Sequence, residues 1–379
     1  MRYGYVLLLI LIAIASAIIM YPNNHLNYSF DDLNYYHYAV QQYYGTFNPL
    51  QSPYAFGYLL PLPIMISFHL FGFSLLAASL PFMIMYVMLI ILIYLICTKL
   101  FNGLISFTTA LMASFTAFIV GYSPRLLPDM PIGLAVAFAL YFLLSKAQTK
   151  AFLAGLFAGL IFYIKIGAAL IIPIFLIGLL MIKSNRKTLY FLIGVVLIAF
   201  IYFGLLGFNF NIIPSYSAQQ SGNRNQTDIY SNIYEMMYIM PVGYTFYTSR
   251  ASIQIFPLGL LFLLGIIGGI ISIYKRNIKV LYAFLLFMGV YLYLFLGTES
   301  LHSYISITVE ARYMIWIAAP IALCSAYCIN EIFNYIQKTW GRRYSYISLM
   351  LIVTLAFISN LPSLILFASH QYWFLGAPI

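Results

Sequence analysis

Residues 27–45 read NYSFDDLNYYHYAVQQYYG and hold two adjacent carboxylates, Asp31 and Asp32. The whole chain of 379 residues has only 8 acidic residues. An apolar run over residues 3–21 comes just before, and its length suits an uncleaved helix that crosses a bilayer. Ser29 and Asp32 fit a capping box, which predicts a helix that ends at Gly45. A cap explains one acid, which leaves the other available as a general base at the membrane surface.

Composition places the chain among membrane proteins. Charged residues make up 7% of it and hydrophobic residues 64%, with a mean hydropathy of +0.95. Because a soluble domain has roughly 25% charged residues, we predict an all-α polytopic membrane protein with a single membrane domain over residues 1–379. The net charge of +10 indicates topology rather than nucleic-acid binding, since the basic residues stand in small clusters between apolar stretches.

Eleven apolar stretches determine how often the chain crosses the membrane. They cover residues 3–21, 55–71, 74–97, 104–122, 131–145, 151–182, 188–207, 252–274, 280–297, 313–335 and 345–367. The stretch 55–71 is short and carries two prolines, so we place it at the outer face as a juxtamembrane segment. The stretch 151–182 is too long for one helix and fits a hairpin with Lys165 at its tip. This interpretation gives about eleven transmembrane helices, and whether 55–71 crosses stays open.

Basic residues distinguish the possible topologies, because they favour the cytoplasmic side. With the N-terminus in the cytoplasm, thirteen of the 18 basic residues fall inside. If 55–71 crosses and the hairpin is kept, only six basic residues fall inside. If both assignments are reversed, eleven basic residues fall inside, and Asp129 then lies across the membrane from Asp32. In the chosen topology seven of the 8 acidic residues lie outside and only Glu331 lies inside.

We therefore expect a protein of the cell membrane whose active site lies on the outer side. Its two largest segments are residues 22–73, which contain the paired acids, and residues 208–251. The second segment ends in an apolar, tyrosine-rich stretch that predicts an interfacial helix on the outer leaflet.

A second acidic loop reads GYSPRLLPDMP over residues 121–131. Asp129 fits the N-cap of the next helix, and Arg125 stands four residues earlier, where it can pair with that acid. The chosen topology also returns this loop to the face that carries Asp32. The sequence thus offers an acidic pair and a fixed cation at one membrane depth.

Further cations accompany this face. Lys165 either snorkels to the membrane surface or faces a cavity. Arg250 fits an interfacial anchor. Arg312, close to Glu310, fits the same role. Taken together, the outer cations also fit a cradle for an anionic lipid phosphate, for which a guanidinium is well shaped; they are Arg125, Lys165, Arg250 and Arg312.

Aromatic residues surround the paired acids. Tyr35, Tyr36 and Tyr54 fit either sugar stacking or an aromatic belt at the interface. His37 fits proton transfer, metal binding or a structural role. No Asp-x-Asp, H-E-x-x-H or P-loop motif occurs, so the sequence predicts no cofactor, although a divalent metal stays open.

The order of these features resembles the GT-C membrane glycosyltransferases, in the branch of protein O-mannosyltransferases and aminoarabinose transferases. FDDLNYYHYA, residues 30–39, is similar to the first-loop acidic motif of that family, which implies that Asp31 is the catalytic base with Asp32 beside it. YSPRLLPDMP, residues 122–131, resembles the second acidic loop, which implies that Asp129 organises the site with Arg125 near it.

Three further segments carry the resemblance. Residues 52–72 resemble the family segment that runs from Lys-Pro-Pro-Leu to Phe-Gly, although Gln51 and Ser52 stand where that segment has its basic residue. YIKIGAALIIP, residues 163–173, implies a hairpin lysine that faces the active site. EARYMIWIAAP, residues 310–320, resembles the late Arg-Tyr segment, here Arg312 and Tyr313. The Trp-Trp-Asp-Tyr-Gly signature of oligosaccharyltransferases is absent.

The resemblance implies an inverting glycosyltransferase that moves one sugar from a polyprenyl (dolichyl-type) phosphate to a glycan, protein or lipid hydroxyl. The three acids would be catalytic and the four cations would hold the phosphate. The expected substrate-binding residues are Tyr35, Tyr36, His37, Tyr54, Glu310 and Tyr313. One alternative is a transporter or flippase for lipid-linked sugars, but acids on one face and no visible repeat favour an enzyme. The other is a non-catalytic subunit of a glycan-assembly complex.

Overall fold

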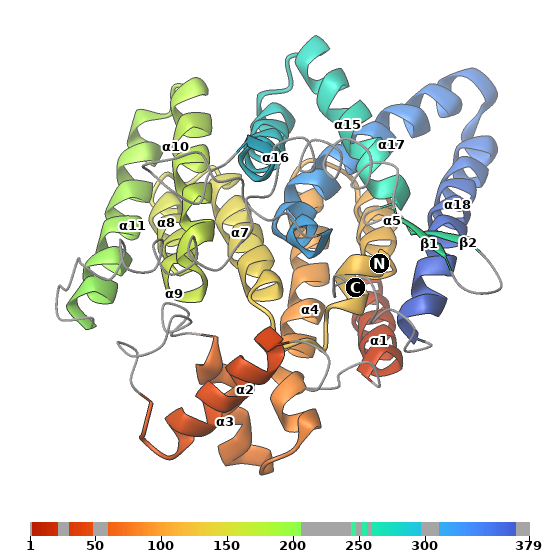
Figure 1. The fold of residues 1–379 in the computed structure, drawn as a ribbon. Helices are drawn as coiled ribbons and strands as arrows, with labels where there is room; N and C mark the ends of the chain where they lie inside the picture. Colours follow the sequence, from red (N-terminus) through yellow and green to blue (C-terminus); the bar gives the residue numbers. More distant parts are fainter. Residues whose placement is uncertain are drawn as a thin grey trace.

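The computed structural model describes residues 2–21, 30–47, 60–205, 244–247, 252–255, 259–296 and 311–368, which form a bundle of helices with one short β-hairpin (Figure 1). The first half of the chain contains α1 (Arg2–Met20), α2 (Phe30–Tyr43), α3 (Pro61–Phe71), α4 (Leu75–Thr98), α5 (Gly103–Ser114), α6 (Ala117–Gly121), α7 (Asp129–Leu143), α8 (Lys150–Gly159), α9 (Ile161–Ile164), the 3-10 helix η3 (Ile166–Leu170), α10 (Ile171–Met181) and α11 (Asn185–Leu205). The second half contains β1 (Tyr244–Tyr247), β2 (Ser252–Ile255), α15 (Gly259–Tyr274), α16 (Ile278–Leu296), the 3-10 helix η5 (Ala311–Ile317), α17 (Ala318–Trp340) and α18 (Arg342–Ala368).

Many of the helices have the length and composition of membrane spans. Among the described residues, five helical stretches are long and apolar enough to cross a bilayer, and seven shorter apolar helices accompany them. The long stretches are Tyr3–Met20, Leu75–Thr98, Asn185–Gly204, Arg312–Trp340 and Arg342–Ile365. The chain is thus a multi-pass helical membrane protein, as the composition predicts. The number of eleven crossings and the cytoplasmic N-terminus remain predictions.

Glycines bring the helices of the bundle into close contact. A Cβ atom at Gly155 in α8 would lie 2.0 Å from the carbonyl oxygen of Phe191 in α11, and one at Gly194 would lie 2.3 Å from that of Phe152. In the same way, a Cβ at Gly268 in α15 would lie 1.9 Å from the carbonyl oxygen of Cys324 in α17. Lipid tails are as apolar as leucine, so close backbone packing of this kind is what holds membrane helices together.

Helices α2 and α3 form a unit on one side of the bundle, below it in Figure 1. As predicted, α2 ends before Gly45, whose φ of +69° is left-handed. The Thr46 N–H donates to the Gln41 carbonyl at 2.9 Å, which closes the last turn as a Schellman motif. Ser29, the expected capping residue at the start of α2, lies outside the described residues.

The long apolar stretch 151–182 is interrupted at Lys165, as the sequence predicts. The backbone of Lys165 is extended (φ −159°, ψ 112°) between α9 and η3, and α10 then contacts α8. Helix α9, which ends directly before Lys165, lies at the end of the bundle that faces α2 (Figure 1).

The structure contradicts two sequence predictions around β1 and β2. Residues 252–274 were expected to be one apolar span, yet Ser252–Ile255 pairs antiparallel with Tyr244–Tyr247, and the helix begins only at Gly259. The alternation Ser-Ile-Gln-Ile has the period of a strand, and Pro257 in the sequence disfavours a continuous helix. The expected interfacial helix at the end of residues 208–251 is described only at 244–247, where the chain is a strand instead.

Candidate active site

Asp129 is the first residue of α7, and its side chain is buried. Pro128 occupies the N-cap position, and the helix has no side-chain cap bond, so Asp129 does not have the capping role that its position in the sequence also fitted. The indole N–H of Trp316 in η5 donates to Asp129 Oδ1 at 2.9 Å. The acid is therefore fixed by a side chain 187 positions away.

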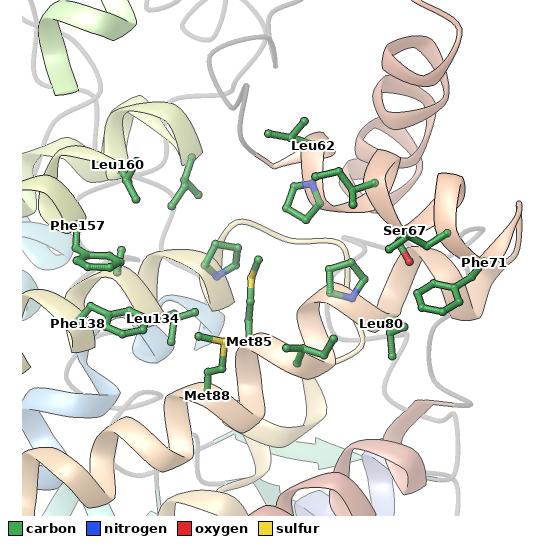
Figure 2. A pocket seen from close by; sticks show the side chains of 18 residues that line it. Leu62, Ser67, Phe71, Leu80, Met85, Met88, Leu134, Phe138, Phe157 and Leu160 are labelled. Atoms are coloured by element: carbon green, nitrogen blue, oxygen red, sulfur yellow. The ribbon is translucent and has the colours of Figure 1, made fainter.

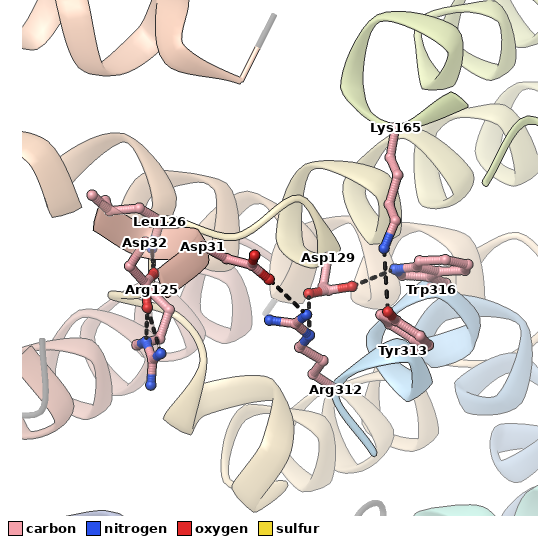
Figure 3. A network of polar contacts seen from close by, with 9 residues as sticks. All are labelled: Asp31, Asp32, Arg125, Leu126, Asp129, Lys165, Arg312, Tyr313 and Trp316. Carbon is pink, nitrogen blue, oxygen red and sulfur yellow. Dashed lines mark hydrogen bonds and ion pairs between the residues drawn. The ribbon is translucent and has the colours of Figure 1, made fainter. Parts of the chain in front are cut away.

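Arg312 links two of the predicted acids (Figure 3). Its Nη2 donates to Asp31 Oδ2 at 3.1 Å, and its Nε lies 3.5 Å from Asp129 Oδ2. The Arg312 side chain is 8% exposed and that of Asp129 is 1% exposed, whereas 31% of the Asp31 side chain is exposed. One guanidinium thus compensates a buried and an accessible carboxylate, because three segments, α2, α7 and η5, meet here.

Asp32 has a different environment from its neighbour Asp31. It is fully buried and accepts hydrogen bonds from Arg125 Nε at 2.8 Å, from Arg125 Nη2 and from the Leu126 N–H at 2.7 Å. Successive helix residues point about 100° apart, so the two carboxylates of α2 diverge. Arg125 pairs with Asp32 and not with Asp129, four residues further along.

Lys165 reaches the same cluster from the interruption between α9 and η3. Its ammonium group donates to Tyr313 Oη at 3.2 Å and lies 4.6 Å from the ring centroid of Tyr313 and 5.8 Å from that of Trp316. These two rings stack with their centroids 4.8 Å apart. Aromatic faces attract a partly buried cation, so the two rings hold the Lys165 ammonium group at the cluster.

The remaining predicted residues do not all join the cluster. Tyr35 is buried among apolar residues of α2, α3 and α4, and Tyr36 places its ring edge-on to Phe68, with the centroids 5.4 Å apart. His37 is exposed, and its ring lies edge-on to that of Tyr36 with the centroids 6.3 Å apart. Arg250, Tyr54 and Glu310 lie outside the described residues.

An apolar cavity of about 530 Å³ lies between helices of the first half of the chain (Figure 2). Residues of α3, α4, α7, α8 and α9 line it, and Ser67 is the only one of them with a polar side chain. The lining includes Pro131, two residues after Asp129, and Ile164, which directly precedes Lys165. The lining therefore includes close sequence neighbours of an acid and a cation of the site.

Sequence reasoning did not single out this cavity or Trp316. The cavity is made of apolar side chains from four regions of a chain that is 64% hydrophobic, so its residues have no distinguishing pattern. Trp316 stands three residues after Tyr313 and so shares its side of a tightly wound helix, which is the one local signal that links it to the site.

Within the described residues, no group of three or more histidine, cysteine, aspartate or glutamate side chains is arranged to hold a metal ion. The carboxylates that do meet, Asp31 and Asp129, have the Arg312 guanidinium between them. In this arrangement the compensating charge comes from the protein itself.

Comparison with solved structures identifies the fold. ArnT from Cupriavidus metallidurans in the apo state superposes with a TM-score of 0.64 at 13% sequence identity, over 98% of this chain and 75% of ArnT. The chain has the GT-C fold. ArnT bound to undecaprenyl phosphate gives a TM-score of 0.57 at 14% identity, over 97% of this chain and 75% of that one.

A second GT-C glycosyltransferase shows the same likeness. The oligosaccharyltransferase AglB from Archaeoglobus fulgidus, in complex with an inhibitory peptide and a dolichol-phosphate, gives a TM-score of 0.53 at 16% identity over 97% of this chain. This chain spans 56% of the length of that protein, and 55% of the Archaeoglobus fulgidus oligosaccharyltransferase tethered with an acceptor peptide.

The sequence itself matches one family model. Residues 56–206 match that of the dolichyl-phosphate-mannose-protein mannosyltransferases, and no curated protein sequence matches the chain. The matched region contains Arg125, Asp129 and Lys165, and also every residue that lines the apolar cavity. The predicted resemblance to the GT-C glycosyltransferases is thereby confirmed.

Proposed function

We propose that this chain is an inverting glycosyltransferase that moves a single sugar from a polyprenyl phosphate to a hydroxyl acceptor. One observation carries the proposal: the structure combines a charged cluster, in which Arg312 joins an accessible acid, Asp31, to a buried one, Asp129, with an apolar cavity whose lining includes sequence neighbours of that cluster. A polyprenyl phosphate has the same division into an apolar chain and an anionic head. The family-model match over residues 56–206 supports the same class of donor.

Asp31 is the general base in this proposal. Of the three acids it is the one with an accessible carboxylate, since Asp32 and Asp129 are buried. Both oxygens of Asp32 already accept hydrogen bonds from Arg125 or Leu126, so a proton taken up there would break a buried ion pair. Asp32 and Arg125 then serve as a structural link between α2 and the loop before α7.

Lys165 is the principal ligand of the donor phosphate. It directly follows Ile164 of the cavity lining, and its ammonium group is held against Tyr313 and Trp316. Arg312 contributes a second positive charge while it orients Asp31 and Asp129. Preorganised cations of this kind stabilise the charge that develops on a leaving phosphate.

The reaction then follows from these positions. Asp31 takes the proton of the acceptor hydroxyl as its oxygen attacks the anomeric carbon of the sugar. The new bond forms on the face opposite the phosphate, and the bond from the anomeric carbon to the phosphate oxygen breaks. Its electron pair leaves with the polyprenyl phosphate, whose additional negative charge Lys165 and Arg312 stabilise. We place this site on the outer membrane face, because the positive-inside rule assigns the lysine-rich end to the cytoplasm.

A transfer assay tests the proposal. The full chain in proteoliposomes is incubated with polyprenyl phosphates that carry labelled hexoses or pentoses, together with membrane extracts as the source of acceptor. We expect Asp31→Asn to lower transfer by about 10²- to 10⁴-fold, the usual contribution of a positioned general base.

Glu331→Gln is the matched control. It removes one carboxylate at the ion pair with Lys275, away from the proposed site, and is expected to retain wild-type transfer. Thermal unfolding of both variants shows that the fold is kept. Undiminished transfer by a folded Asp31→Asn variant would contradict the proposed base, and no transfer from any donor by the wild type would leave the transporter or subunit interpretation.

A further inference from the structure

Four lysines meet at the end of α7 that is remote from the candidate active site. We call them the lysine cluster; they are Lys99, Lys150, Lys187 and Lys279. Lys99 donates to the Tyr141 carbonyl, and Lys187 donates to the carbonyls of Leu143 and Ser145, all at the C-terminal end of α7. Because α7 begins at Asp129 and rises about 1.5 Å per residue, roughly 21 Å of helix separates the cluster from the acids.

Within the described part of the chain, no carboxylate forms an ion pair with the lysine cluster. Among the residues that the structure describes, the acids are Asp31, Asp32 and Asp129 at the candidate active site, and Glu331, which pairs with Lys275. Burial and then repulsion from the other three lysines lower the pKa of Lys99 from 10.5 to about 8. Like charges held this close oppose folding unless an anion screens them.

The positions of the lysines along their helices also favour a bound anion. Lys150, Lys187 and Lys279 stand in the first turns of α8, α11 and α16. A helix N-terminus is the positive end of the helix dipole, where a lysine is unfavourable and an anion is favourable. Three first-turn lysines gathered at one place are the arrangement expected for a bound anion.

The surroundings of the cluster suit a lipid. Exposed apolar side chains stand on the same helices within a few residues of the lysines: Leu153 on α8, Leu189 on α11 and Ile278 on α16. Lys150 and Lys279 are themselves exposed. A phospholipid offers a phosphate for the ammonium groups and acyl chains for the apolar side chains.

We propose that the lysine cluster binds the phosphate group of an anionic phospholipid at the membrane face opposite the candidate active site. The lipid screens the four ammonium groups from one another and so stabilises the packing of α7, α8, α11 and α16. The site is independent of the proposed transferase chemistry, because none of its residues belongs to the candidate active site.

Lipid titration of the purified full chain in detergent tests the proposal. Dioleoylphosphatidylglycerol is expected to raise the thermal unfolding midpoint, whereas dioleoylphosphatidylcholine and inorganic phosphate leave it unchanged. Lys150→Gln/Lys279→Gln removes the two exposed charges, each worth about fivefold in binding to an anionic lipid surface. We therefore expect the lipid concentration for half of the shift to rise by up to about thirtyfold.

Lys338→Gln/Arg343→Gln is the matched control, since it removes two exposed basic residues at the junction of α17 and α18 and leaves the cluster intact. It is expected to respond to phosphatidylglycerol as the wild type does. An equal response to phosphatidylcholine, or an unchanged response in Lys150→Gln/Lys279→Gln, would overturn the proposal. An equal response to inorganic phosphate overturns the lipid assignment and indicates a site for the free anion. If the double variant does not fold, the response to phosphatidylglycerol is measured in the two single variants. Native mass spectrometry then shows which lipid the wild type retains.

Discussion

Arg312 Nη2 lies 3.1 Å from Asp31 Oδ2, although 281 positions separate the two residues in the chain. The same guanidinium lies 3.5 Å from Asp129, so one side chain near the C-terminal end of the sequence orients acids from two earlier segments. The accessible acid, the buried acid and their common cation thus depend on the docking of η5 against α2 and α7. Variants that remove single parts of this arrangement separate structural roles from catalytic ones.

The buried pair of Asp32 and Arg125 is expected to be structural. Asp32→Ala leaves the Arg125 guanidinium without its carboxylate in a buried site, which costs about 3–5 kcal/mol of unfolding free energy. Asp32→Leu/Arg125→Met removes both charges and should recover most of that loss, because an apolar pair of similar volume avoids the desolvation cost. Denaturation of the purified variants in mixed micelles measures both values. A loss in Asp32→Ala no larger than in Glu331→Gln would show that the pair does not hold the fold.

Trp316 is expected to act as a positioning residue through Asp129. Trp316→Phe keeps an aromatic ring beside Tyr313 but removes the N–H that donates to Asp129 Oδ1. We expect kcat for sugar transfer to fall by about tenfold to a hundredfold through misorientation of the acid. The KM for the donor should stay near the wild-type value, since the cavity and Lys165 are unchanged. A purely structural role would instead lower the unfolding midpoint with little change in kcat.

The apolar cavity is expected to select donors by chain length. Leu134→Trp fills part of the volume between α4 and α7 without touching the charged residues. In the wild type a long polyprenyl donor should react faster at low concentration than a one- or two-isoprene analogue, because each buried methylene contributes about 0.8 kcal/mol. The variant should lose this preference while it still uses the short donor. Leu192→Trp, on the exposed side of α11, is the control and should keep the preference.

The pKa of Lys99 predicts how stability depends on pH. Burial, followed by repulsion from Lys150, Lys187 and Lys279, lowers this pKa from 10.5 to about 8 in the folded chain. Between these two values the unfolded chain binds more protons than the folded chain, so the unfolding free energy rises with pH across that window. Relative to Lys99→Met, the wild type should therefore gain stability from pH 8 to about 10.5. A constant difference between the two proteins over this range would contradict the prediction.

Local features of the fold could be predicted from the sequence. Apolar runs of sufficient length indicate membrane helices because an unpaired backbone is costly in lipid, and Gly45 marks the end of α2 because it readily adopts a left-handed conformation. The interruption at Lys165 also follows from length and charge alone. By contrast, the strand at Ser252–Ile255 was missed, because a short apolar run does not distinguish a strand from the start of a helix.

The sequence by itself determined the helical membrane character and the set of charged residues available on one face. Through the resemblance of several short motifs, it also pointed to acids and cations that the structure brings together. Only the tertiary structure decided the pairing: Asp32 with Arg125, Asp31 and Asp129 with Arg312, and Lys165 with Tyr313. These partners are 93 to 281 positions apart, and no local periodicity links residues at such separations. Side-chain direction, burial and the packing of α2, α7 and η5 choose the partner, since a buried charge is stable only where its compensating group is held within reach.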